Sequence, residues 1–312
     1  MERDEVEQEM TDLLVEALEF QERPKAAMFY CRLALECQIH AKYHDQEGHF
    51  PDEDGFKDFT KIMGKIEQSL TTQTKEVLWS INAQTRGSMH WGNETSGNKG
   101  AKTRHVTAVV NQISATYQDM FGSELILTGL EIGGTNENIV KKSISKALTD
   151  LGIENDSKNI ELPNGENLPN EEDLMYIEVL LDAAEAAVEK GIMFDPWHDI
   201  RLGLAAKLAG HLERAEGHYK QALRHFKQIG DRGGEAGSLN NLGIIAETRG
   251  DLIEAERLQR ESLAIRREIG DRGGEADSLF NLGLIAETRG DLVEAERLHQ
   301  ESLAIMREIG DY

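Results

Sequence analysis

The sequence has 312 residues, enough for about two domains at roughly 150 residues each. Its 34 Lys and Arg against 57 Asp and Glu give a formal net charge of −23, which repels phosphate groups, so binding to nucleic acid or to an anionic membrane surface is not expected. The first ten residues are acidic and resemble no secretory signal, and no apolar run is long enough to span a bilayer. We therefore expect a cytoplasmic protein with no membrane partner.

Residues 1–153 are predicted to form a helical domain. Pro24 suits the first turn of a helix, and the apolar residues that follow it mark a buried face. Cys31 and Cys37 lie on this helix but point about 240° apart, so no disulfide between them is expected. A short strand is predicted at 125–132. The predicted helices are 5–21, 24–43, 56–69, 73–84, 104–121 and 138–151.

Two stretches of this domain resemble the HEPN-like four-helix domains. They are FYCRLALE, residues 29–36, with an Arg-x-x-x-Glu pattern, and NAQTRGSMHWGN, residues 82–93. Some members of that family are metal-independent ribonucleases that use an Arg and a His. The resemblance implies Arg86 as the cation and His90 as the proton-transfer group, with three residues between them, one fewer than the family spacing. The competing interpretation is a structural loop at a helix junction, with no catalytic residues.

No metal or cofactor site is expected. His40 and His44 lie four residues apart on one helical face, but no third ligand of fixed geometry accompanies them, so a solvated helix end is the favoured interpretation. The glycines at 129, 133 and 134 do not have the spacing of a phosphate-binding loop.

Residues 154–173 are predicted to form an acidic linker, because they are rich in Asn and acidic residues and hold two of the five prolines. An apolar helix at 174–190 follows. We expect it to lead into the last part of the chain and to dock onto the first of three repeats, so that residues 174–312 form one domain.

The last 80 residues before the C-terminal dipeptide contain two nearly identical copies of one segment. Residues 231–270 recur as residues 271–310 with seven differences, and a more divergent copy precedes them at about 191–230. A period of 40 residues predicts stacked helix pairs. The array is therefore expected to contain about three such pairs.

Each copy is predicted to form two helices. We number the copies in chain order, so that the second copy is residues 231–270. In this copy Gly250 ends the first helix in the left-handed conformation, and Asp251 caps the next helix. Gly243 lies in the middle of the first helix, where glycine costs about 1 kcal/mol relative to alanine. Its recurrence as Gly203 and Gly283 predicts a close approach of the two helices in every copy.

The recurring residues resemble the tetratricopeptide (TPR) repeat in its form of about 40 residues, over roughly residues 195–312. The resemblance implies an all-α fold, namely an α-solenoid whose first helices line a concave groove that binds a protein or peptide. The matching positions of the second copy are Leu242, Gly243, Gly250, Ala255, Ser262 and Leu263.

Three of the seven differences between the copies fall on the first helix, and TPR geometry implies that they face the groove. Asparagine carboxamides there can bind an extended peptide backbone. We therefore expect a protein-interaction adaptor or regulator, and a ribonuclease with repeats for dimerisation or partner sensing is the alternative. The predicted partner-binding residues are Asn240, Asn241, Ile244, Phe280, Asn281 and Leu284.

The last repeat has no further repeat after it within these 312 residues. Some apolar surface of its second helix is therefore predicted to face solvent or another molecule. We expect self-association through this repeat, by way of Leu298, Leu303 and Ile305, or a longer array of which this chain is a part.

Overall fold

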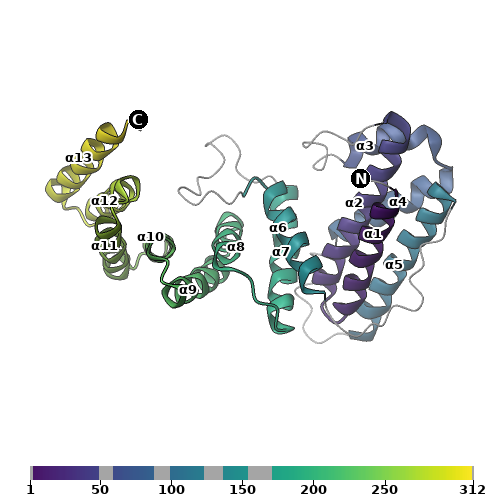
Figure 1. The fold of residues 1–312 in the computed structure, drawn as a ribbon, viewed down its shortest axis with the longest axis horizontal. Coiled ribbons are helices and arrows are strands. Elements are labelled where there is room, and N and C mark those ends of the chain that lie inside the picture. The colour runs from purple at the N-terminus through teal and green to yellow at the C-terminus, as the bar shows by residue number, and fades with distance from the viewer. Residues whose placement is uncertain (1–2, 49–58, 88–98, 123–135, 154–170, 311–312) are drawn as a thin grey trace. The chain divides into compact units, whose positions relative to one another are not determined.

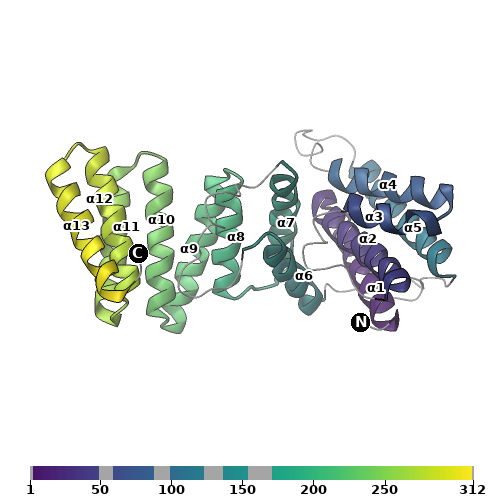
Figure 2. The same cartoon turned by 90° about the horizontal axis from the view of Figure 1, so that it is seen from above.

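The computed structural model describes residues 3–48, 59–87, 99–122, 136–153 and 171–310. Within these ranges the regular structure is helical and contains no strand (Figure 1, Figure 2), which confirms the all-α prediction. The chain divides into two compact units. One is Met1–Gly152 with Pro169–Met193, and the other is Ile153–Leu168 with Phe194–Tyr312.

The first unit is built around α2, which packs against α1, α3, α4, α5 and α7. The side of α2 that was predicted to be apolar is buried, with Met28, Cys31, Leu35 and Ile39 at most 1% exposed. The helices of this unit are α1 (Arg3–Glu19), α2 (Pro24–Glu47), α3 (Phe59–Ile66), α4 (Thr72–Gly87), α5 (Lys99–Phe121), α6 (Glu137–Asp150) and α7 (Glu171–Glu189), with a short 3-10 turn at Glu67–Ser69.

Helix α7 differs from our expectation, because it belongs to the first unit rather than to the repeats. It packs against α2 and α6, and the ring of Tyr176 lies 6.1 Å from that of Phe29 on α2. Its start at Glu171 makes the last three residues of the expected linker helical. The rest of the linker, 154–170, and the predicted strand at 125–132 lie outside the described residues.

The second unit consists of three helix pairs, as the repeats predict. The glycine after each first helix has φ between 79° and 82°, and Asp251 accepts a hydrogen bond from the backbone N–H of Glu254 at 3.1 Å. Both predicted helix ends are thus confirmed. The pairs are α8 (Pro196–Leu208) with α9 (Leu212–Ile229), α10 (Arg232–Thr248) with α11 (Leu252–Ile269), and α12 (Arg272–Thr288) with α13 (Leu292–Ile309).

The two helices of each pair cross closely at the recurring glycine. A Cβ atom at Gly203 would lie 2.5 Å from the ring of Tyr219, and one at Gly243 would lie 2.7 Å from the Nε2 atom of Gln259. The third copy repeats this arrangement with Gly283. Glycine is therefore retained because a larger residue would overlap the facing helix, despite the cost to helix stability.

Candidate interaction surface

The first helices of the three pairs lie on one side of the array. Helix α10 contacts both α8 and α12, whereas neighbouring second helices make fewer contacts with each other. Closer approach on one side of a stack makes that side the inner one, as Figure 1 shows for α8, α10 and α12. We call this side the first-helix side.

The six residues predicted to bind a partner lie on α10 and α12. Phe280 is exposed by 49%, and the other five are partly exposed. None of the six belongs to the fully buried core of its repeat. They are therefore accessible to a ligand, at least in part.

The asparagines are not equivalent. The side-chain amide of Asn281 donates to the Oδ1 atom of Asn240 at 2.9 Å and so links α12 to α10. The backbone carbonyl of Asn240 also accepts from Gln259 at 3.0 Å. Asn241, by contrast, makes no side-chain hydrogen bond among the described residues, so its carboxamide is the one available to a peptide.

The environment of Phe280 could not be predicted from the repeat pattern. Its ring lies 5.1 Å from the imidazole of His299 on α13, and this contact places it at the end of the array. In the previous copy the same position is Asn240, which reaches the following repeat. Phe280 therefore lies where the first-helix side meets α13.

The residues predicted for self-association separate into two groups. Leu298 and Ile305 are each 4% exposed and pack in the core of the last repeat, so the expectation that they face outward is corrected. Leu303 is 44% exposed, whereas its equivalent Leu263 in the previous copy is 8% exposed. The difference arises because α12 covers Leu263 and no described helix follows α13.

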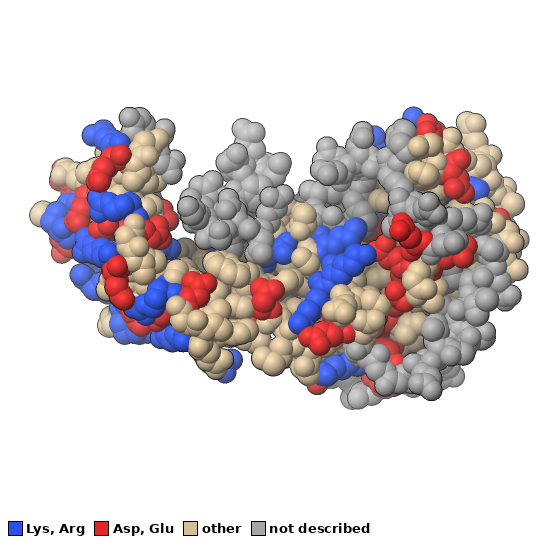
Figure 3. Space-filling view, viewed as in Figure 1, with Lys and Arg blue, Asp and Glu red and all other residues tan. Residues whose placement is uncertain are grey.

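Ion pairs connect successive repeats in a regular pattern. Arg249 pairs with Glu216 of the preceding repeat, and 40 residues later Arg289 pairs with Glu256. Figure 3 shows the resulting alternation of basic and acidic side chains over α11, α12 and α13, at the left of the view. Exposed pairs of this kind contribute at most about 1 kcal/mol each.

The N-terminal candidates, Arg86 and His90, stay a prediction. Arg86 falls in α4, but its side chain and the whole of His90 lie outside the described residues. Arg32 is buried, donates to Glu36 on its own helix and to Asn82 on α4, and lies 5.5 Å from the ring centre of Phe59. This cluster ties α2 to α4 and leaves the guanidinium inaccessible to a substrate.

Burial also disfavours the reactive thiolate form of Cys31. Desolvation raises the pKa of the Cys31 thiol to about 12, so the thiolate is scarce at neutral pH. Both cysteines are free thiols. In the described part of the chain, no group of three His, Cys, Asp or Glu side chains is arranged to hold a metal ion.

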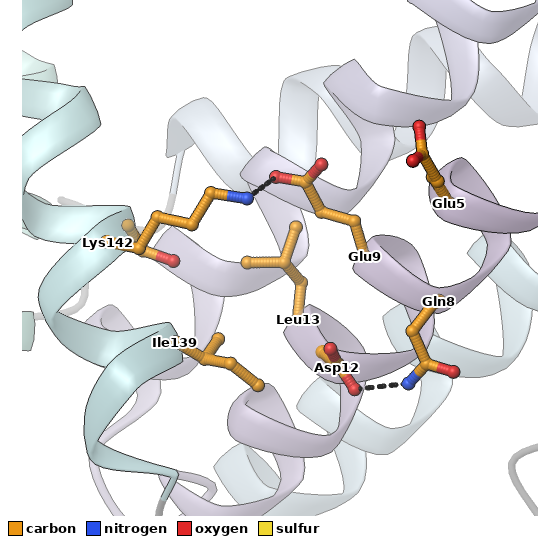
Figure 4. Close-up of a pocket in the computed structure, with 8 residues that line it drawn as sticks. Glu5, Gln8, Glu9, Asp12, Leu13, Ile139 and Lys142 are labelled. Carbon is orange, nitrogen blue, oxygen red and sulfur yellow. Dashed lines mark hydrogen bonds and ion pairs between the residues drawn. The ribbon is translucent and has the colours of Figure 1, made fainter. Parts of the chain in front are cut away.

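A shallow pocket lies between α1 and α6 of the first unit (Figure 4). Three carboxylates line it, those of Glu5, Glu9 and Asp12, and the ammonium of Lys142 lies 3.3 Å from Glu9. Gln8 donates to Asp12 at 2.8 Å. The lining is acidic and is partly neutralised within itself, because the ammonium of Lys142 pairs with Glu9.

The geometry of the second unit is that of a helical-repeat protein, in which paired antiparallel helices stack in one dimension. Residues 234–308 match the family model described as "Tetratricopeptide repeat". The resemblance to TPR repeats is thus confirmed for the two nearly identical copies. The resemblance of the N-terminal residues to HEPN-like domains is not confirmed.

A solved structure titled "Crystal structure of BtubC (BKLC) from P. vanneervenii" is similar with a TM-score of 0.45 and 18% identity, over 89% of this chain and 93% of that one. A match at this level carries no functional information. No curated protein sequence matches the chain. None of the described helices is long and apolar enough to cross a membrane.

Proposed function

We propose that the chain is a protein-interaction adaptor that binds an extended segment of a partner protein along the first-helix side. The observation that carries this proposal is the pattern of change between the two TPR copies. The apolar core residues are kept, while three of the seven differences fall on the first helix. They are Gly237 and Asp277, Asn240 and Phe280, and Ile244 and Leu284.

The chemistry of this side suits an extended segment with apolar side chains. The free carboxamide of Asn241 can donate to and accept from a peptide backbone. Ile244, Leu284 and the exposed ring of Phe280 supply apolar contact area beside it. Aromatic side chains of this kind often dominate the binding energy of an interface.

The test begins with the proteins that the full chain retains from a native lysate, identified by mass spectrometry and made as peptides. Phe280→Asn restores the residue of the previous copy, and Asn241→Ala removes the free carboxamide. Each is expected to weaken the affinity for the peptide about tenfold. Ile253→Asn is the matched control, because Ile253 is 80% exposed on α11, away from the first-helix side. Equal affinities for all four proteins would contradict the proposal.

The alternative function, a metal-independent ribonuclease with Arg86 and His90, rests on the N-terminal resemblance alone. The net charge of −23 opposes the approach of RNA. Incubation with RNA in the absence of metal, with Arg86→Ala and His90→Ala beside the unaltered chain, tests it directly. If the unaltered chain cleaves RNA and either variant does not, the ribonuclease function would replace the adaptor proposal.

A further inference from the structure

The last repeat exposes a side of α13 that the previous repeat keeps covered. In the previous copy, α12 packs on the corresponding side of α11. Leu303 is 44% exposed against 8% for Leu263, and Leu292 is 65% exposed whereas Leu252 is partly buried. We call this side the end face. Its first five members recur every three or four residues, and Arg307 follows Leu303 by four; the members are Leu292, Glu296, His299, Leu303, Met306 and Arg307.

The end face has lost polar groups rather than gained them. In the previous copy Asn240 bonds to Asn281, and Arg266 lies 3.3 Å from Asp277, both in the following repeat. Gln259 is fully buried there. A repeat that ends in water is expected to have a polar outer side. In the last copy two of these three positions are apolar, Phe280 and Met306, and the third is His299.

The end face also has a cation without an ion-pair partner among the described residues, namely Arg307. Its equivalents in the earlier repeats are Lys227 and Arg267, and each pairs forward. Lys227 lies 3.8 Å from Glu261, and Arg267 lies 2.8 Å from Glu301. Arg307 therefore lies at a position that forms an ion pair with the following repeat in the earlier copies, but the described chain has no following repeat to supply the glutamate.

Glu296 has the complementary charge. Its equivalents Glu216 and Glu256 each pair with an arginine of the following repeat. In the last copy Glu296 accepts a hydrogen bond from Gln300 of the same helix. Glu296 and Arg307 are about 16 Å apart along α13 at 1.5 Å per residue, so they cannot neutralise each other within one chain.

A second copy of the chain satisfies both charges at once. If two α13 helices pack antiparallel, Glu296 of each lies opposite Arg307 of the other, and Leu303 lies opposite His299. Both pairs are centred on the same point of the helix, near residue 301, so one register brings them together. A two-fold axis repeats every contact, which gives a self-complementary surface. We propose that the end face is a homodimer interface formed by antiparallel α13 helices, independently of the adaptor function.

The decisive experiment is a charge exchange measured by sedimentation equilibrium on the full chain, from 1 to 100 µM in about 0.3 M salt to screen self-repulsion. The unaltered chain is expected to dimerise reversibly. Glu296→Arg and Arg307→Glu each place like charges opposite each other, and each is expected to raise the dissociation constant at least tenfold. An equimolar mixture of the two variants is expected to recover dimers, because the introduced charges then oppose each other and so do the native ones.

Val293→Arg is the control, because Val293 is 81% exposed on α13 and its equivalent Ile253 is 80% exposed although a repeat follows it. It lies off the end face and is expected to leave dimerisation unchanged, and circular dichroism checks that every variant is folded. An unaltered chain that stays monomeric at 100 µM would overturn the proposal. A mixture that fails to recover dimers would overturn it too, since another surface or another partner would then occupy the end face.

Discussion

Replacing Gly203 by alanine tests whether close helix crossing holds the repeats together. The new Cβ atom would lie 2.5, 2.7 and 2.9 Å from three atoms of the Tyr219 ring. This ring is fully buried, so it has no open space to turn into. The helices of the first repeat would have to move apart.

Two opposing contributions determine how much Gly203→Ala changes the free energy of unfolding. Alanine in a helix interior is favoured over glycine by about 1 kcal/mol. Overpacking of a tight core costs about 1–3 kcal/mol, and a buried ring belongs in the upper part of this range. We expect Gly203→Ala to lower the free energy of unfolding by about 1–2 kcal/mol. Gly237 on α10 has nothing within 4 Å of its Cβ position, so Gly237→Ala should instead raise it by about 0.5–1 kcal/mol.

The assay is urea unfolding followed by the fluorescence of Trp197, whose ring lies 4.9 Å from that of Phe226 in the first repeat. Replacing Trp79 and Trp91 by phenylalanine in all proteins isolates this signal. The midpoint should fall for Gly203→Ala and rise for Gly237→Ala. Equal or higher stability of Gly203→Ala would refute the reasoning, because the helix preference would then outweigh the overlap.

Three further predictions concern stability. Because burial raises the pKa of Glu16 to about 7 against 4.5 in the unfolded chain, its contribution is fully favourable below about pH 4.5 and is lost as the pH rises through 7. Glu16→Gln should therefore raise the melting temperature at pH 8 and leave it nearly unchanged at pH 4.5; a lower value at pH 8 would contradict this. Asn281→Ala should cost about 1 kcal/mol in chemical unfolding because it breaks the bond to Asn240, whereas Asn241→Ala should cost almost nothing; equal costs would speak against the bond. Added salt should raise the melting temperature up to about 1 M because it screens the net charge of −23, and a fall would show that the surface ion pairs dominate.

The repeat array could be predicted closely because each of its determinants is local and occurs more than once. The second helix of the second copy begins at Leu252, directly after the predicted cap Asp251, and ends at Ile269, directly before Gly270. The role of Gly243 followed from its recurrence in the middle of a helix. Two copies of one pattern leave few alternative structures.

The packing between helices could not be predicted, because it depends on contacts between residues far apart in the sequence. Nothing in the sequence of α7 shows that its apolar side packs on α2 rather than on a repeat, because both surfaces are apolar. Likewise, the spacing that placed Leu298, Leu303 and Ile305 together did not show which side of α13 its partner α12 buries. The bond between Asn240 and Asn281 joins neighbouring repeats, so it depends on how the repeats stack.

Two copies that share 33 of 40 residues separate folding from recognition, because a position that differs cannot need one particular residue for the common fold. Ile253 and Val293 are both about 80% exposed, so their difference carries no information. Arg266 and Met306 differ at a position where the second copy meets the next repeat and where no described repeat follows the last copy. An arginine suits the acidic Asp277 across that contact, and a thioether suits an apolar cover. The two copies therefore share one apolar core, and they differ in the side chains at the surface that faces the next repeat or another molecule.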